Sequence, residues 1–171
     1  MKTICCYVAL CLLLPLTATA QQTGLQDALL DFLAGNWVLR GTIAGTEATH
    51  DIVSEWVLGH YYLRLHEVSR EKSDGGEPVY EAIVFIGRDE ASNQYTCQWL
   101  DSTGGSGLTA EAFGHAKKSG DDLPFVFELG DGSIIFTTFA YKREDDTWQW
   151  LIDVERDGKR TTFARVTLTR Q

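Results

Sequence analysis

The stretch Leu33-Ala34-Gly35-Asn36-Trp37 separates a short predicted helix from a long series of predicted strands. Ahead of it, Leu25, Leu29 and Leu33 recur at a spacing that places them on one face of a helix. Gly35 follows at a position where a helix is expected to end. The stretch therefore predicts where the helix stops and where a sheet begins.

Ten segments after this stretch are rich in Val, Ile, Thr, Phe, Tyr and Trp, the residues that fit the pleated, half-buried surface of a sheet. Turn-forming pairs such as Asp131-Gly132 and Asp157-Gly158 separate some of them. No second helix of convincing length interrupts the strands, which excludes parallel strand-helix-strand units. The predicted strands are 38–43, 50–58, 61–69, 79–87, 94–101, 108–113, 125–129, 133–141, 147–154 and 161–169.

An even number of strands joined in sequence predicts an all-β, up-and-down antiparallel barrel, because the first and last strands can then pair. Closure of the sheet removes the exposed strand edges that otherwise promote aggregation. A barrel of ten strands can enclose a lumen, whereas about eight strands only just enclose side chains or one small ligand. The same pattern leaves a two-sheet sandwich as the alternative fold. Residues 21–171 are expected to form one domain.

The first 20 residues have the parts of a secretory signal peptide. Lys2 is their only charge, an apolar run covers residues 4–16, and Ala18-Thr19-Ala20 forms a small-residue end. Cleavage is expected before Gln21, which predicts an exported protein, periplasmic or secreted. The apolar run is shorter than the ~20 residues of a membrane-spanning helix, so an uncleaved membrane anchor is the weaker alternative. After cleavage, no membrane insertion is expected.

Cleavage would leave one cysteine in an acidic chain. Cys97 alone cannot form an internal disulfide, and its place in an alternating strand predicts a buried, unreactive thiol. Without Lys2, the 15 Lys and Arg become 14 against 24 Asp and Glu, which gives a net charge of −10. This charge argues against nucleic acid or an anionic membrane as a partner. The oligomeric state stays open.

Three parts of the chain resemble known proteins. Residues 33–37 are similar to the Leu-x-Gly-x-Trp opening of lipocalin-type, or calycin, barrels. Residues 82–101 resemble a largely bacterial family of exported lipocalin-like proteins, a domain of unknown function, and residues 167–170 resemble its closing strand. The positions that match the family signature are Gly87, Asp89, Tyr95, Trp99, Asp101 and Ser102.

The resemblance also implies how one end of the barrel is closed. In calycin barrels the motif tryptophan plugs the closed end, and an arginine of the last strand lies over it. Carried over, Trp37 is the plug and Arg170 its partner, with Arg165 as the other candidate. A guanidinium over an indole contributes ~0.5–2 kcal/mol. This pair is expected to be structural, which places the functional end of the barrel opposite Trp37.

No cofactor or metal site is predicted. The four histidines, His50, His60, His66 and His115, lack a metal-binding spacing, and no Cys-x-x-Cys motif is present. Nitrobindin-like haem barrels share the Gly-x-Trp opening, but their ligating histidine lies near the end of the chain. No histidine follows His115 here, which argues against haem.

Candidate ligand-binding residues come from three predicted strands. In the first, Tyr62 and His66 lie on the face opposite Leu63 and Leu65, so both would point outward if the leucines line the lumen. Asp101 is either a ligand anchor at the barrel mouth or a turn residue that accepts backbone N–H groups. The aromatic residues either line a pocket or fill a solid core. The candidates are Tyr62, His66, Tyr95, Trp99, Asp101, Trp148 and Trp150.

Three functions fit these observations. The leading hypothesis is a non-enzymatic protein that binds a small apolar or amphipathic ligand in the lumen, because no catalytic motif is recognisable. The second is a barrel enzyme (a cyclase, isomerase or hydrolase) that uses Asp101, Glu111 or Asp153 with a histidine at the mouth. The third is an accessory or interaction protein with a solid core, which acts through its loops.

Overall fold

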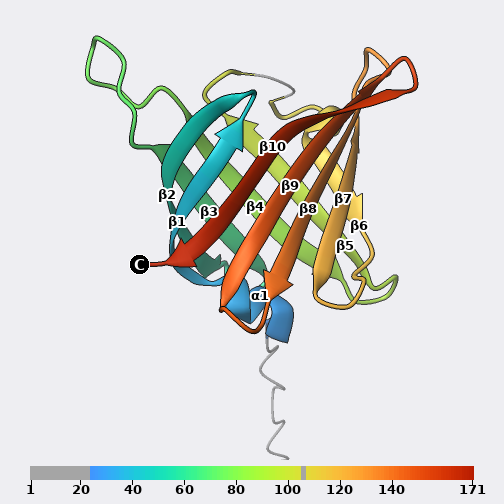
Figure 1. Cartoon of the computed structure of the whole chain (residues 1–171). Coiled ribbons are helices and arrows are strands. Elements are labelled where there is room, and N and C mark those ends of the chain that lie inside the picture. The colour runs from blue at the N-terminus through green and yellow to red at the C-terminus, as the bar shows by residue number, and fades with distance from the viewer. Residues whose placement is uncertain (1–23, 105–106) are drawn as a thin grey trace, which may run out of the picture.

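Ten strands form one closed antiparallel barrel in the computed structural model, which describes residues 24–104 and 107–171 (Figure 1). Each strand pairs with its neighbours in sequence, and β1 pairs with β10 from Trp37–Arg170 to Ile43–Ala164 to close the sheet. The predicted up-and-down barrel with a short helix before it is confirmed, and the sandwich is excluded. The elements are α1 (Ala28–Leu33), β1 (Gly35–Ile43), β2 (Thr46–Val57), β3 (Tyr62–Ser69), β4 (Glu81–Asp89), β5 (Gln94–Asp101), η1 (Ala110–Ala112), β6 (Phe113–Ala116), β7 (Asp122–Glu128), β8 (Ile134–Lys142), β9 (Thr147–Arg156) and β10 (Lys159–Arg170).

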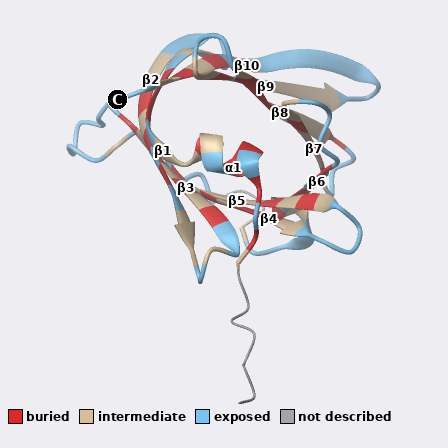
Figure 2. Cartoon of the chain, turned by 90° about the horizontal axis from the view of Figure 1, so that it is seen from below, coloured by how far each residue is buried: buried red, intermediate tan, exposed pale blue. Residues whose placement is uncertain are grey.

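The helix α1 fills one end of the barrel, as the view from below shows (Figure 2). It begins after Asp27, whose carboxylate accepts hydrogen bonds from the backbone N–H groups of Leu29 and Leu30. The other oxygen of this buried carboxylate accepts from the Tyr95 hydroxyl and, at 3.2 Å, from Arg88. Asp27 therefore caps the helix and ties it to the barrel wall. The leucines of α1 pack into the core.

Trp37 and Arg170 complete this closed end. The Trp37 indole is fully buried and donates a hydrogen bond to the Leu33 carbonyl at 2.8 Å. The Arg170 guanidinium lies 4.2 Å from the centre of the indole ring and donates to the carbonyls of Phe32 and Ala34. Arg165, the other candidate partner of Trp37, instead pairs with Asp153. The seal is thus built from the first and last strands and the end of α1.

One predicted strand is displaced along the chain. The prediction of a strand over 108–113 is wrong for most of its length, because a single 3-10 turn, η1, occupies Ala110–Ala112 and Leu108 is 81% exposed. The strand β6 begins at Phe113, where pairing with β5 starts at Gln98. Of the described residues just before β6, Gly107, Glu111 and Ala112 border the interior of the barrel.

A bulge in β10 alters the wall near the other end. The register between β9 and β10 shifts between Thr162 and Ala164, which leaves Phe163 without a partner in the β9–β10 ladder. Strand alternation would place neighbouring side chains on opposite faces, yet Phe163 and Ala164 both border the interior. The bulge thus adds an aromatic ring to the open end of the barrel.

The predicted signal peptide lies within residues 1–23, outside the described residues. Within the described ranges, no helix has both the length and the apolar character needed to cross a membrane.

Candidate functional site

A cavity of about 610 Å³ occupies the half of the barrel opposite α1. Its lining comes from the inner faces of most strands and from the connections at the rim, including the segments before β4 and after β5. The half of the barrel opposite α1 is therefore hollow, which does not fit the hypothesis of a solid core. The volume of the cavity lies within the ~300–1,000 Å³ that is usual for small-molecule sites.

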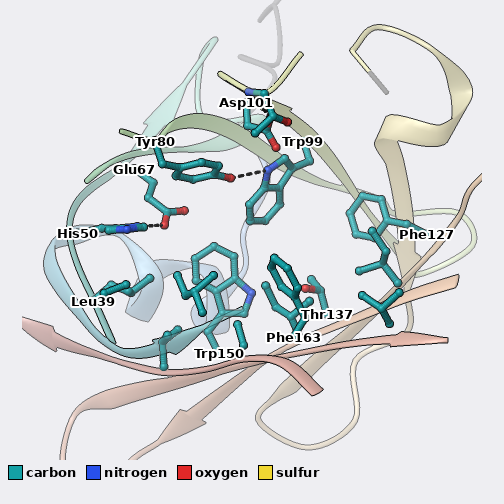
Figure 3. Close-up of a pocket in the computed structure, with 18 of the residues that line it drawn as sticks. Leu39, His50, Glu67, Tyr80, Trp99, Asp101, Phe127, Thr137, Trp150 and Phe163 are labelled. Carbon is teal, nitrogen blue, oxygen red and sulfur yellow. Dashed lines mark hydrogen bonds and ion pairs between the residues drawn. The ribbon is translucent and has the colours of Figure 1, made fainter. Parts of the chain in front are cut away.

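Aromatic rings form much of the cavity wall (Figure 3). The rings of Trp99 and Trp150 lie 5.2 Å apart, and Trp150 stacks on Phe139 beneath the cavity at 4.5 Å. Phe127 and Phe163 line the same space from other strands. These rigid rings have large apolar faces, which suit a flat or aromatic ligand.

A histidine and a carboxylate meet inside the barrel. His50 projects from β2 and Glu67 from β3, and the His50 Nδ1 lies 2.5 Å from Glu67 Oε1 (Figure 3). Their side chains are only 7% and 4% exposed. The two strands bring them together because Ile52 pairs with Glu67 and His50 with Ser69, which makes His50 and Glu67 diagonal neighbours on the inner face.

Tyr80 extends this polar cluster. Its ring stacks on His50 with a centroid distance of 5.7 Å, and its hydroxyl accepts a hydrogen bond from Trp99 Nε1 at 3.2 Å. Burial, together with the negative charges of Glu67 and Asp101, holds the pKa of the Tyr80 phenol well above its ordinary value. Tyr80 therefore stays neutral.

Two buried polar atoms of the cavity lining have no hydrogen-bond partner among the described residues. They are Glu67 Oε2 and the indole Nε1 of Trp150. A buried polar atom without a partner costs ~1–3 kcal/mol, so such atoms call for an explanation. Both atoms are enclosed by protein in this structure, so a bound molecule would reach either of them only after the side chains around it move.

Three of the seven residues predicted to bind a ligand line the cavity: Trp99, Asp101 and Trp150. Asp101 also accepts hydrogen bonds from the backbone N–H and hydroxyl of Thr103, so it has the predicted turn role as well as a place at the rim. Of the other carboxylates considered, Glu111 lines the cavity, whereas Asp153 pairs with Arg165.

The other four residues predicted to bind a ligand do not line the cavity. Tyr95 and Trp148 are buried nearer the closed end, where Tyr95 donates to Asp27 and Trp148 packs on Tyr141. Burial and the hydrogen bond to Asp27 raise the pKa of Tyr95 to about 12. Tyr62 and His66 face outward, because the neighbouring Leu63 and Leu65 fill the interior. His66 lies on the outer face and pairs with Glu81 at 2.6 Å.

The sequence did not single out His50 among its four histidines, and sequence reasoning missed Glu67 and Tyr80. Glu67 lies two residues after Leu65 and four after Leu63, so it shares their inward face of β3. This spacing is the signal that could have identified it. The remaining histidines lie outside the cavity: His60 stacks on Trp56, and His115 lies near Thr96. In the described part of the chain, no three His, Cys, Asp or Glu side chains are grouped to hold a metal ion.

The sequence matches none of the protein-family models, and no curated protein matches it.

Proposed function

We propose that the protein is an exported, lipocalin-like binding protein that holds a small, mainly apolar molecule in the barrel lumen. The observation that carries this proposal is the open cavity of about 610 Å³ above a sealed end. Its walls combine rigid aromatic rings with a few buried polar atoms, the usual composition of a small-molecule site. The export of the protein rests on its first 20 residues alone.

Titration with N-phenyl-1-naphthylamine, a neutral aromatic probe, tests the proposal. The probe should bind saturably with one molecule per chain, seen as probe emission and as quenching of tryptophan fluorescence. Ala164→Phe should abolish binding, because Ala164 is buried, lines the cavity and leaves room there for the added ring.

The matched control is Thr167→Phe, which adds the same ring to the outer face of β10, between the inward Val166 and Leu168. This variant should bind the probe as the unmodified protein does. Failure of the probe to bind, or equal binding by Ala164→Phe, would contradict the proposal.

A second function, an acid–base enzyme, is supported by the His50–Glu67 pair. A catalytic base must come within hydrogen-bond reach of the proton that it takes, and it needs a partner that orients it. Glu67 orients His50 through the contact at Nδ1. The Nε2 atom is then the ring nitrogen left to exchange a proton with a substrate. Glu67 takes the role that the sequence had suggested for Asp101, Glu111 or Asp153.

A panel of aryl esters and enolisable ketones tests this second function. Turnover that is lost in His50→Ala and kept in His66→Ala would support it, because His66 forms a similar pair on the outer face. Turnover that survives His50→Ala would reject it.

A further inference from the structure

The cavity lining has a strong excess of negative charge. Five carboxylate side chains border it: Glu47, Glu67, Glu71, Asp101 and Glu111. Neither Lys nor Arg occurs among the described residues that line the cavity. His50 is the one lining side chain there that can become cationic, and a protonated His50 would offset only one of the five charges. Acidic side chains therefore outnumber basic ones in the cavity lining by a wide margin.

One oxygen of the most buried of these carboxylates, Glu67, has no hydrogen-bond partner among the described residues. Glu67 uses Oε1 to bind His50, while Oε2 has no partner in the described structure. Figure 3 shows the free oxygen of Glu67 directed toward the interior, on the side that faces Trp99. A carboxylate in such a place is best satisfied by a cationic donor, since charge-assisted hydrogen bonds are about twice as strong as neutral ones.

The surrounding side chains also suit a cation. Trp99 and Trp150 line the cavity, and indole is the aromatic system that attracts cations most strongly. Burial raises the pKa of Tyr80 most, and the carboxylates of Glu67 and Asp101 raise it further. The lining carboxylates and the two indoles thus both favour positive charge at the polar side of an otherwise apolar space.

We infer that the ligand is a cationic amphiphile, an amine with an aromatic or apolar body, whose ammonium group binds Glu67. The apolar body lies against Trp99 and Trp150, and the rim carboxylates attract the cation to the mouth. This inference rests on the proposed function, since it names the class of molecule that the lumen would hold.

Isothermal titration with three ligands that share one naphthalene body tests the inference. The ligands are 2-(1-naphthyl)ethylamine, 2-(1-naphthyl)ethanol and 1-naphthaleneacetate, which are cationic, neutral and anionic at neutral pH. The amine should bind at least about tenfold more tightly than the alcohol, a difference of ~1.4 kcal/mol, and the carboxylate should bind most weakly.

Variants assign this preference to one residue. Glu67→Gln should lower the affinity for the amine by about tenfold and leave that for the alcohol within about twofold. Glu81→Gln is the matched control, because Glu81 also pairs with a histidine but on the outer face, and it should change neither affinity.

The possible failures are distinguishable. Equal affinity of the unmodified protein for amine and alcohol would overturn the inference and leave the proposed function standing. A preference for the amine that survives in Glu67→Gln would also overturn it. Absence of binding by all three ligands and by the neutral probe would overturn both. If Glu67→Gln fails to fold, the ligand series on the unmodified protein still tests whether the lumen prefers the cation, and Glu67→Ala or Glu67→Met repeats the test of Glu67.

Discussion

Removal of His50 should destabilise the protein far more than removal of the similar histidine on the outer face. In His50→Ala, the Glu67 carboxylate loses the 2.5 Å contact at Oε1 while Oε2 has no partner among the described residues. Breaking a fully enclosed ion pair costs ~3–5 kcal/mol. Because Glu67 borders a cavity that can admit water, we expect a smaller loss of about 2–3 kcal/mol in the free energy of unfolding.

His66→Ala is the control for this prediction. His66 and Glu81 lie 2.6 Å apart, but their side chains are 36% and 50% exposed. Exposed pairs contribute ~0–1 kcal/mol, so the loss should stay within that range. Urea unfolding at neutral pH, followed by tryptophan fluorescence, measures both variants on the same scale.

A double variant tests whether the cost of His50→Ala comes from the unpaired Glu67 carboxylate. The free energy of unfolding of the double variant His50→Leu and Glu67→Met should lie within about 1 kcal/mol of that of the unmodified protein. Buried ion pairs rarely stabilise a protein more than apolar residues of similar size do. If His50→Ala costs no more than His66→Ala, the reasoning is refuted. It is also refuted if the double variant is as unstable as His50→Ala.

Three further predictions concern the seal and the buried thiol. Arg170→Ala should lower the free energy of unfolding by about 1–3 kcal/mol, through loss of the contact with Trp37 and of two carbonyl hydrogen bonds; in a urea titration, Arg165→Ala should cost clearly less. The hydrogen bond from Arg170 holds the pKa of Asp146 below its ordinary value of 3.8, so the stability from this carboxylate is present above that value and lost as the pH falls through the folded-state pKa. Asp146→Asn should therefore destabilise the protein at neutral pH, and its difference from the unmodified protein should shrink in acid; a difference that grows in acid would contradict this. Burial raises the pKa of Cys97 well above its ordinary value, so iodoacetamide should modify it only after unfolding, as mass spectrometry would show; rapid labelling of the folded protein would be inconsistent with the structure.

Strand alternation predicted which side chains share a face of a strand, but not how far each lies from the closed end of the barrel. Tyr95 and Trp148 share inner faces with Trp99 and Trp150, yet each lies on the side toward the closed end. The face of a strand follows from its pattern, whereas the height at which the core ends depends on α1 and Asp27. For this reason the pattern alone could not separate cavity residues from core residues.

The pairing of His50 with Glu67 was hidden for a different reason. Parity places both on inner faces, but their contact depends on the register of β2 against β3, which the intervening turn fixes. Phe163 is a similar case, because only a bulge brings it to the cavity. Local departures from regular pairing thus shape the candidate site, and they leave little trace in the sequence.

A crystal structure of the protein with 2-(1-naphthyl)ethylamine tests the lumen as a ligand site most directly. The naphthalene ring should lie inside the barrel against Trp99 and Trp150, with its nitrogen within ~4 Å of a Glu67 carboxylate oxygen. An amine bound on the outer surface, or one inside the lumen with its nitrogen turned away from Glu67 toward solvent, would contradict this placement.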